Sequence, residues 1–599
     1  MDTFKLIPYG VSSFVDIRTR DMYYVDKTMF IPEIEEISFA FLLRPRRFGK
    51  SLFTAMLHAY YDINYANRFD ELFSGLWIHE HPTRDRGKYF CLRFDFSGID
   101  KEDENVQSAF NKYCMHCINT FTDDYEGVLP LSVIEKIREA KTSYDKLLVI
   151  EREFGKLGHK LYILIDEYDN FTNTLLTDQG HKLYEQMTKG SGFFKAFFTN
   201  LKKMTSGNSN VLQRLYITGV SPITMDDVAS GFNIGTNISL IPRFSNMLGF
   251  SENDVSEMID YYKSTGRLTL CKDELIFELK KWYDEYRFYE KATESTFNST
   301  GVLSVMYYSL DSDTLPTIII DENLRMDSKK LQHLVYEGTN LNGNFNALSE
   351  IISNGGIECN INKSFPFKML KQTENYISLI FFLGFLTFSG KTKKGKPFLC
   401  IPNETIMNLV YEYILSILKE SIRIDDWFFE LDKLCGYLAY DGDFKPVFNF
   451  IAKLINQQTS IRDFKEGEEI IKTFHNVYLR INTIYYTKTE FEMNKGYADI
   501  VLFPNYSQYP DIKYAYLIEV KYIKRDIKAE MLPEEIEQKI NIAKKQLEQY
   551  TEDHPSRQEY HLKPNGTVEL KKLIVVYHGW EMVYCEEWSS EFGIRNYEK

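Results

Sequence analysis

FAFLLRPRRFGKSLF, at residues 39–53, is the stretch around which the chain is organised. The apolar run FAFLL leads into RPRRFGKS, and the periodic run SLFTAMLHAYY follows at once, which predicts a strand, a tight loop and a helix. Such a loop suits a phosphate, because backbone N–H groups and a helix N-terminus bind the anion, a lysine (Lys50) reaches the outer phosphates and a hydroxyl (Ser51) ligates Mg²⁺. The alternative is an ordinary strand-to-helix turn with a basic edge.

The loop matches the phosphate-binding pattern G-x-x-x-x-G-K-[ST] only in part. Arg44 stands where the first glycine is expected, whereas Gly49, Lys50 and Ser51 are all present. The choice between the two interpretations therefore depends on the sequence downstream. The residues assigned to phosphate binding are Arg46, Arg47, Phe48, Gly49, Lys50, Ser51 and Leu52.

Length and charge restrict the class of protein. A chain of 599 residues is expected to form two to four domains, and 44% hydrophobic residues suffice for buried cores. The formal net charge of −14 argues against a surface coated in nonspecific nucleic-acid contacts, although a local basic cleft remains compatible with it. The acidic charge is equally compatible with a monomer and with a homo-oligomer.

The cysteines and the apolar runs predict a cytoplasmic protein that does not enter a membrane. Eight cysteines at irregular spacings indicate reduced thiols, and CMHC at residues 114–117 has no second pair at metal-ligand spacing, so we expect a helix with packed thiols there. The longest apolar run, YISLIFFLGFLTF at residues 376–388, is too short to cross a bilayer. The N-terminus shows no secretory signal pattern.

A second decisive stretch is KLYILIDEYDN, at residues 160–170. Its apolar run predicts a parallel strand buried on both faces, and the strand ends in Asp166 and Glu167. At the carboxyl end of such a strand, the first acid can hold Mg²⁺ and the second can polarise the water that attacks a γ-phosphate. The alternative is a buried strand with two solvated acids at its exit.

A third strand, RLYITGV at residues 214–220, carries Thr218 at its carboxyl end. If this strand lies between the phosphate loop and the acidic pair, Thr218 can sense the γ-phosphate. Three strands that each end in a residue type suited to nucleotide hydrolysis indicate a nucleotide site more specifically than one such strand does. Arg243 is a candidate cation for phosphate charge, with a surface arginine as the commoner alternative.

The segments VDKT, LLRPRRFGKSL, LIDEYDN and ITGVSP, in this order and spacing, resemble the AAA-ATPase-like family of bacterial proteins, which commonly carries a C-terminal PD-(D/E)XK nuclease-like domain. In that family the loop also begins RPRRFGKS, so the missing first glycine is shared. The resemblance implies that Lys50 and Ser51 bind phosphate and Mg²⁺ (a Walker A loop) and that Asp166 and Glu167 form the acidic strand end (Walker B). It implies ATP binding more directly than hydrolysis.

Near the C-terminus, Asp499 lies in KGYADIVLF and the later run YAYLIEVKY contains Glu519 and Lys521. Side chains alternate along a strand, so Glu519 and Lys521 point the same way, and Asp499 on a neighbouring strand can join them. Two carboxylates then bind Mg²⁺ and the lysine positions a water for attack on phosphorus. The alternative, an E-x-K solubility device on an edge strand, fits poorly because the surrounding residues are apolar.

The order D…E-x-K between two helices resembles the PD-(D/E)XK core. By this resemblance Gln546 is a helical glutamine near the site, and Glu469 is a candidate extra acid on the first helix, with a surface acid as the favoured alternative. Tyr497 replaces the arginine common in the GRADI text of the family, which puts one phosphate contact in question and leaves the metal ligands Asp499 and Glu519 in place.

The sequence as a whole predicts an α/β protein in four parts. These are a P-loop NTPase parallel sheet (residues 1–250), a helical or winged-helix connector (251–403), a helical spacer (404–465) and a PD-(D/E)XK restriction-endonuclease-like domain (466–599). The preferred function is an ATP-binding protein, expected to be an ATPase, coupled to Mg²⁺-dependent cleavage of DNA held in a local cleft. The alternative is a nucleotide-switched regulatory or scaffold protein whose nuclease-like domain binds without cutting.

Overall fold

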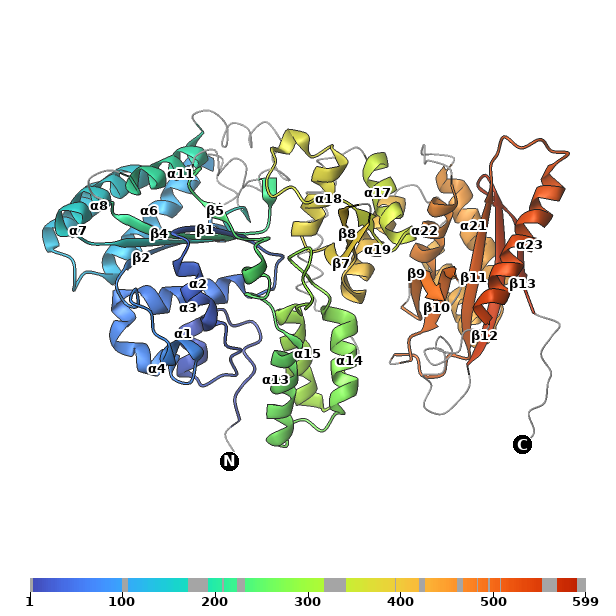
Figure 1. Cartoon of the computed structure of the whole chain (residues 1–599), viewed down its shortest axis with the longest axis horizontal. Helices are drawn as coiled ribbons and strands as arrows, with labels where there is room; N and C mark the ends of the chain where they lie inside the picture. The colour runs from blue at the N-terminus through green and yellow to red at the C-terminus, as the bar shows by residue number, and fades with distance from the viewer. Residues whose placement is uncertain are drawn as a thin grey trace. The chain divides into compact units, whose positions relative to one another are not determined.

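The computed structural model describes residues 4–99, 106–170, 192–206, 210–223, 232–316, 341–393, 395–419, 426–459, 467–481, 483–493, 496–506, 508–551 and 568–589. The chain divides into two compact units (Figure 1). The first unit comprises Met1–Thr339 and Glu358–Ile406, and the second comprises Asn340–Ile357 and Met407–Lys599. The finer domain limits at residues 250, 403 and 465 stay predictions.

The first unit contains a five-stranded parallel sheet in the order β2-β3-β4-β1-β5. Its strands are β1 (Phe39–Leu43), β2 (Phe90–Asp95), β3 (Leu161–Asp166), β4 (Leu212–Gly219) and β5 (Thr236–Asn237). Every residue of β3 is buried, as expected for a strand covered on both faces. The prediction that β4 lies between the phosphate-loop strand and the acidic strand is confirmed. Because the strands are parallel, the residues that follow β1, β3 and β4 meet at one edge of the sheet.

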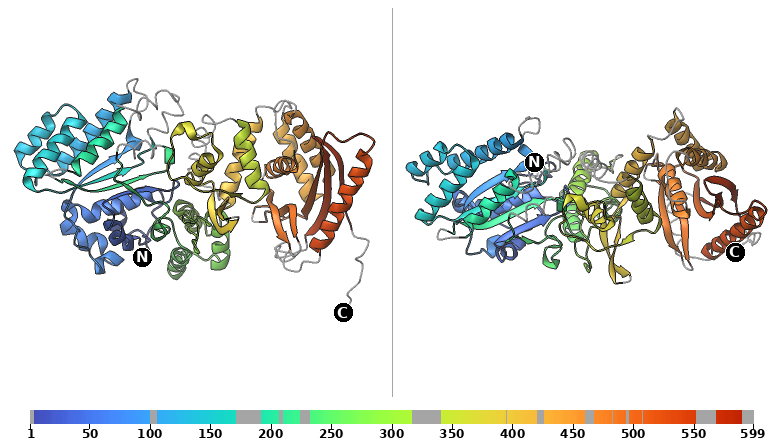
Figure 2. Two further views of the ribbon diagram at one scale, coloured as in Figure 1. Left: turned by 45° about the horizontal axis from the view of Figure 1, so that its top comes forward. Right: turned by 90° about the horizontal axis from the view of Figure 1, so that it is seen from above.

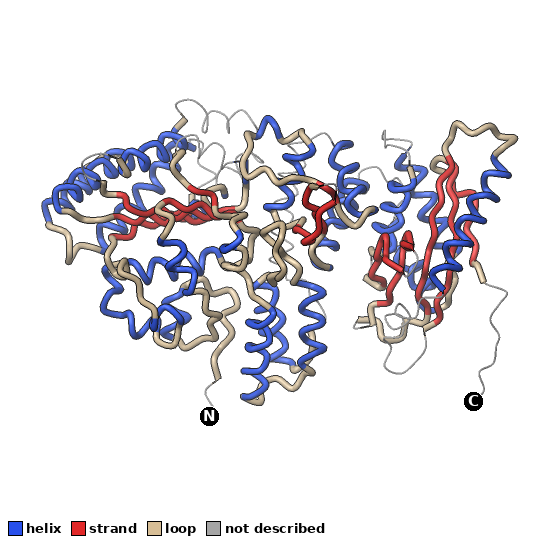
Figure 3. The backbone as a smooth tube through the Cα atoms, in the orientation of Figure 1, coloured by secondary structure: helices blue, strands red, loops and turns tan. Residues whose placement is uncertain are grey.

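Helices cover both faces of this sheet (Figures 1 and 3). The helices drawn below it in Figure 1 are α1 (Phe14–Thr19), α2 (Ile31–Glu35), α3 (Lys50–Tyr61) and α4 (Phe69–Phe73), with α5 (Trp77–Glu80) beside α4. The opposite layer holds α6 (Val106–Asp124), α7 (Leu131–Glu139), α8 (Ser143–Leu157) and α11 (Phe193–Met204). Cys114 is fully buried on α6 and Cys117 is half-buried, so the expectation of packed helical thiols is confirmed.

The other described elements of the first unit include helices and a hairpin that forms part of a three-stranded sheet in the order β6-β8-β7. These helices and the strands of the hairpin are α13 (Glu252–Ser264), α14 (Lys272–Tyr283), α15 (Ser299–Ser312), α18 (Thr373–Phe382), β7 (Thr387–Lys393) and β8 (Lys396–Cys400). Ser251 caps α13 in a capping box with Asp254, which explains why the helix begins there. The two-residue strand β6 (Ile357–Glu358) and α19 (Glu404–Lys419) lie at the division between the units.

The second unit is a mixed five-stranded sheet with helices on both faces (Figure 2). The strand order is β13-β12-β11-β10-β9, with β11 and β12 parallel and the other neighbours antiparallel. The strands are β9 (Tyr485–Met493), β10 (Gly496–Pro504), β11 (Tyr514–Ile523), β12 (Glu569–His578) and β13 (Glu581–Glu587); the helices are α17 (Leu341–Ser353), α20 (Trp427–Tyr440), α21 (Lys445–Thr459), α22 (Glu468–Leu479) and α23 (Leu532–Thr551). Ala543 and Leu547 of α23 pack on Val501, Leu517 and Ile574 of the sheet. β11 is therefore a central strand, as its apolar residues predict.

All eight cysteines lie in described segments and are free thiols. Among the described helices, none is both long enough and apolar enough to traverse a bilayer.

Candidate nucleotide and metal sites

The predicted phosphate loop connects β1 to α3. Gly49 is the N-cap of α3 and has a φ of 88°, a left-handed conformation that glycine adopts without strain. The first turn of α3 thereby leaves its backbone N–H groups at the end of the loop, where an anion can accept them. Phe48, beside Gly49, is buried and packs edge-on against Tyr286 at a centroid distance of 4.8 Å. The loop conformation is therefore held by packing outside the loop itself.

Lys50 is buried and points back into its own loop. Its Nζ donates to the carbonyl oxygens of Arg44 at 3.1 Å and Pro45 at 2.9 Å. Burial lowers the pKa of Lys50, and the nearby carboxylates, first Glu167 and then Asp166, oppose that shift. In these two contacts the Lys50 ammonium group meets only neutral carbonyl oxygens. It also lies close enough to Glu167 and Asp166 for their negative charges to act on its pKa.

Asp166 and Thr218 form a direct contact between β3 and β4. The Thr218 hydroxyl donates to Asp166 Oδ1, and the Glu167 backbone N–H donates to the same oxygen at 3.0 Å. Glu167 has a φ of 47°, and its Oε2 accepts a hydrogen bond from the Asn170 side chain. The acidic pair and the candidate sensor are therefore one hydrogen-bonded group, as their positions at adjacent strand ends predict.

Asp169 is a residue whose role the sequence did not indicate. It is buried, and its carboxylate accepts the backbone N–H groups of Val220 at 3.1 Å and Ser221 at 2.5 Å. Burial raises the pKa of Asp169, and the Ser221 hydrogen bond opposes that shift. Asp169 therefore fastens the segment after β3 to the segment after β4, which keeps Asp166 beside Thr218.

A cavity of about 530 Å³ opens beside the loop, within the range of 300–1,000 Å³ that is usual for small-molecule sites. Its lining includes every residue from Arg46 to Phe53, together with Glu167 and Asn170. The segment from Pro8 to Ser12 and the residues Tyr24 and Lys27 line it as well. A phosphate chain at the loop therefore has neighbouring space, bounded by N-terminal segments, for the rest of a nucleotide.

Arg44, at the position of the missing first glycine, is a structural anchor. Its guanidinium is 1% exposed and donates to Ser239 O at 2.6 Å and to Phe244 O at 2.8 Å. It also lies 4.0 Å from the centroid of the Phe288 ring, and burial lowers its pKa to about 9. The arginine therefore connects the loop to segments about 200 residues away, which explains why a glycine is not needed here.

Arg243 does not join the group of residues around Lys50. Its guanidinium forms ion pairs with Glu36 and, at 3.6 Å, with Glu33, and it is not part of the cavity lining described above. The alternative that we stated for it, a surface arginine, is the one that this placement favours.

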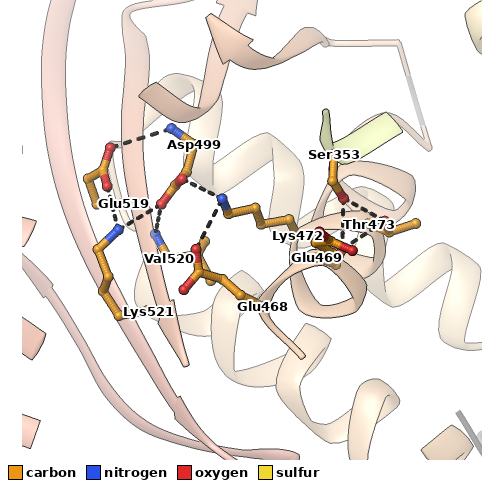
Figure 4. A network of polar contacts seen from close by, with 9 residues as sticks. All are labelled: Ser353, Glu468, Glu469, Lys472, Thr473, Asp499, Glu519, Val520 and Lys521. Atoms are coloured by element: carbon orange, nitrogen blue, oxygen red, sulfur yellow. Dashed lines mark hydrogen bonds and ion pairs between the residues drawn. The ribbon is translucent and has the colours of Figure 1, made fainter. Parts of the chain in front are cut away.

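The second centre brings Asp499, Glu519 and Lys521 together on β10 and β11 (Figure 4). Lys521 Nζ lies 3.1 Å from Asp499 Oδ2 and 2.8 Å from Glu519 Oε2. Asp499 Oδ2 also accepts the backbone N–H of Val520 at 2.9 Å, and the Asp499 N–H donates to Glu519 Oε1 at 3.4 Å. The three side chains are buried, so the predicted cluster forms inside the sheet and not on an exposed edge.

The two carboxyl groups of this centre have opposite pKa shifts. Burial and the neighbouring charge of Asp499 raise the pKa of Glu519 to about 8. Burial also acts to raise the pKa of Asp499, but the ammonium groups of Lys521 and Lys472 outweigh it and hold that pKa below its usual value. Pairs of acids with divergent pKa values are typical of sites that handle protons.

Lys472, on α22, is a member of the cluster that sequence reasoning missed. Its Nζ lies 2.5 Å from Asp499 Oδ1 and 3.2 Å from a carboxylate oxygen of Glu468 (Figure 4). Glu469, the acid that the sequence suggested, is exposed, and its backbone carbonyl accepts hydrogen bonds from Ser353 and Thr473. The available signal was the i, i+4 spacing of Glu468 and Lys472.

Gln546 lies on α23, the helix that packs on β10, β11 and β12. Its Oε1 atom is buried and has no hydrogen-bond partner within the described part of the chain. Its assignment to the site stays a prediction.

Both centres have the donor chemistry of a magnesium site. Mg²⁺ prefers oxygen ligands and is usually held by one or two carboxylates with several waters. Asp499 and Glu519 supply two adjacent carboxylates; in the first centre, Ser51 of the cavity lining supplies a hydroxyl and Asp166, at the end of β3, supplies a carboxylate. No group of three or more His, Cys, Asp or Glu side chains within the described segments is arranged to hold a metal ion, so water or substrate would have to complete either ligand set.

Two family comparisons match separate parts of the chain. Residues 8–229 match the family described as predicted AAA-ATPase. Residues 466–587 match the PD-(D/E)XK nuclease superfamily, and this range contains every residue of the second carboxylate cluster.

An uncharacterised protein from the vnfD 5′ region of Azotobacter chroococcum mcd 1 is 27% identical over 297 residues, which are 49% of this chain and 51% of that protein. The matched region thus spans about half the length of this relative. Among solved structures, Cdc6p from Pyrobaculum aerophilum aligns with 66% of this chain and 93% of its own, at 11% identity and a TM-score of 0.27. The Aeropyrum pernix ORC2 protein aligns over the same shares at 8% identity and a TM-score of 0.29.

Proposed function

Because residues 8–229 belong to the AAA-ATPase-like family and residues 466–587 to the PD-(D/E)XK nuclease superfamily, we propose that this protein binds and hydrolyses ATP in its first unit and cleaves DNA with Mg²⁺ in its second. The observation that carries the proposal is the contact of Lys521 Nζ with both Asp499 and Glu519, since burying these charges without a purpose is costly. The ATP state is proposed to govern access to the second centre.

In the first unit, each residue around the loop has a proposed role toward ATP. The backbone N–H groups from Arg46 to Leu52 cradle the phosphates, and Lys50 exchanges its two carbonyl partners for phosphate oxygens. Ser51 and Asp166 would hold Mg²⁺, which neutralises phosphate charge when bound. Glu167 orients the attacking water, and Thr218 reports the γ-phosphate to Asp166 through their shared hydrogen bond.

ATP binding is tested with Lys50→Ala in the full chain. Loss of a charged hydrogen-bond donor to phosphate predicts affinity that is about 100-fold weaker by isothermal titration calorimetry. Lys141→Ala, at an exposed position outside the cavity lining, is the matched control and should bind as the wild type does. Undiminished affinity in Lys50→Ala would reject Lys50 as a phosphate ligand.

In the second unit, Asp499 and Glu519 would hold Mg²⁺, which activates water and polarises the phosphate when bound. Lys521, held by both carboxylates, positions that water through its ammonium group. Before metal binds, Glu519, with its pKa raised to about 8, holds a proton near neutral pH, which it must release to ligate Mg²⁺. Since the net charge is −14, DNA contact is confined to one cleft.

Cleavage is tested on supercoiled and linear DNA with Mg²⁺ or Mn²⁺, with and without ATP. The wild type should cut, and Lys521→Ala should lose at least about 100-fold in rate, the lower end of what one acid–base group contributes. Lys545→Ala, at an exposed position on α23, controls for loss of positive charge in the same unit. Equal cleavage by wild type and Lys521→Ala would discard the nuclease assignment.

A second candidate function is a nucleotide-switched scaffold whose nuclease-like domain binds nucleic acid without cutting it. One observation favours it: both oxygens of Asp499 and both oxygens of Glu519 already have protein partners. Binding of DNA by wild type and Lys521→Ala, without cleavage by either under any metal condition, is the outcome expected of this candidate.

A further inference from the structure

Lys472 has a position that the D…E-x-K pattern does not account for. It comes from α22 and reaches Asp499 Oδ1, whereas Lys521 comes from β11 and contacts Asp499 Oδ2 (Figure 4). Each oxygen of the aspartate therefore has its own ammonium group. Lys472 and Asp499 are each only 7% exposed in their side chains, so this is a buried ion pair and not a surface contact.

Glu468 holds Lys472 in this orientation from the same helix. The two residues are one helical turn apart, and Lys472 Nζ lies 3.2 Å from the Glu468 carboxylate. The ammonium group thus bridges an acid at the start of α22 and the acid on β10. A divalent metal ion can bind two carboxylates placed in this way, as the Lys472 ammonium group does here.

One oxygen atom cannot serve both cations along the same direction. The Lys472 ammonium is 2.5 Å from Asp499 Oδ1, and a magnesium ion would need to approach that oxygen to about 2.0–2.1 Å. A unit positive charge this close to a bound divalent ion would also repel it strongly in a buried site. The Lys472 ammonium and a metal ion on the same oxygen, Asp499 Oδ1, therefore exclude each other, whereas Lys521 contacts the other oxygen, Oδ2.

We propose that Lys472 is an internal cation that occupies the metal position between Glu468 and Asp499, and that a divalent ion binds there only when the lysine moves out. This inference rests on the proposed role of Asp499 as a metal ligand, and it adds Glu468 as a second ligand that reaches the ion once the lysine has left. Lys472 acts on the metal and not on substrate atoms, so it is a positioning residue.

The first test is Mn²⁺ binding to the full chain without nucleotide, measured by isothermal titration calorimetry. Asp499→Asn defines the part of the binding that depends on the cluster. For that part, Lys472→Met should bind about tenfold more tightly than the wild type or better, because the competing charge is gone. Lys453→Met, at an exposed position on α21, should match the wild type. Equal or weaker binding by Lys472→Met would overturn the proposal.

The second test uses the wild type alone and so does not depend on how the variant folds. Acylation of lysines, measured by mass spectrometry of peptides, should modify Lys472 slowly in the absence of metal, since the residue is buried. Saturating Mn²⁺ should raise the modification rate of Lys472 several-fold and leave that of Lys453 unchanged. Full Mn²⁺ occupancy with no change at Lys472 would contradict the exchange.

The two tests separate this inference from the proposed function. If Mn²⁺ binding depends on Asp499 but is equal in wild type and Lys472→Met, the exchange is wrong and the proposed metal site is retained. Absence of any Asp499-dependent binding in both proteins removes the metal site and the exchange together.

Discussion

The two centres use the same residue types in opposite ways. Around the phosphate loop, the Lys50 ammonium binds the neutral carbonyls of Arg44 and Pro45, and Asp166 is bonded to the Thr218 hydroxyl and to a backbone N–H. In the second unit, the cations and anions contact one another directly, with Lys521 and Lys472 on the two oxygens of Asp499.

The difference teaches how a polar site can be kept folded without its ligand. In the first centre, Lys50 and Asp166 have the neutral hydrogen-bond partners described above, and a cavity of about 530 Å³ opens beside the loop for a charged ligand. In the second centre the cations and anions neutralise one another, and in the proposed exchange an incoming cation displaces one already there. The first should bind its ligand with little rearrangement, and the second should require an exchange.

The largest expected effect is a difference in the free energy of unfolding between Lys521→Met and Lys50→Met. Lys521→Met leaves Asp499 and Glu519 buried with one cation fewer, which should lower the free energy of unfolding of the second unit by about 3–5 kcal/mol. Lys50→Met removes an ammonium whose burial is unfavourable and whose partners are carbonyls, so the first unit should change by less than about 1 kcal/mol. Hydrogen exchange over β11 and β1 in urea measures each effect locally. Equal losses of stability in both units would contradict the contrast between the partners of Lys50 and those of Lys521.

Arg44→Gly restores the glycine of the general phosphate-loop pattern and tests whether the arginine is an anchor. The carbonyls of Ser239 and Phe244 lose their buried donors, so the first unit should lose about 3 kcal/mol of stability, and ATP affinity should fall with it. Thermal unfolding with and without ATP measures both. A variant that is as stable as the wild type would show that the loop keeps its conformation without the Arg44 contacts.

His475 gives the second unit a pH dependence that the first centre does not share. Burial lowers its pKa to about 3, against about 6.5 when unfolded, so the folded state resists protonation. The contribution of His475 to stability should therefore be complete above about pH 6.5 and fall as the pH drops toward 3, with a limiting slope of about 1.4 kcal/mol per pH unit. Its Nε2 is 3.0 Å from the Tyr577 hydroxyl and its ring packs near Phe448, so His475→Phe suits the site.

Urea unfolding of the second unit, repeated at pH values between 4 and 8, gives the free energy of unfolding at each pH. This free energy should change less steeply with pH in His475→Phe than in wild type. His116→Gln, at an exposed position on α6, should keep the wild-type slope. Parallel curves for wild type and His475→Phe would mean that His475 does not titrate in this way.

Thr218→Val should give the smallest change. The hydroxyl donates to Asp166 in the absence of ligand, and removing it costs about 1 kcal/mol or less in ATP affinity. The hydrolysis rate should fall about tenfold or more if Thr218 reports the γ-phosphate. A variant with lower affinity and an unchanged rate would assign Thr218 to binding.

The sequence predicted most of what its local patterns encode. Strand β1 is a continuous apolar run, β3 is apolar up to Asp166, and β4 and β11 are largely apolar; the meeting of their polar residues follows from parallel or adjacent strands. It could not predict the anchoring role of Arg44, because Ser239 and Phe244 are 195 and 200 residues away. The choice between Glu468 and Glu469 depends on the rotation of α22 about its axis, which no residue pattern near the start of the helix fixes. Lys472 was missed for the same reason.

The contacts of the phosphate loop with later segments of the first unit limit how this protein can be divided into fragments. Phe48 O accepts the N–H of Gly249, Arg47 O accepts the N–H of Thr300, and a Cβ at Gly384 would lie 2.8 Å from Pro45. A fragment that stops near residue 250 would therefore strip the loop of the walls that shape it and expose an aromatic side chain to water. Domain swaps, truncations and recombination between relatives should succeed only when they carry residues up to about 406 together with the N-terminal sheet.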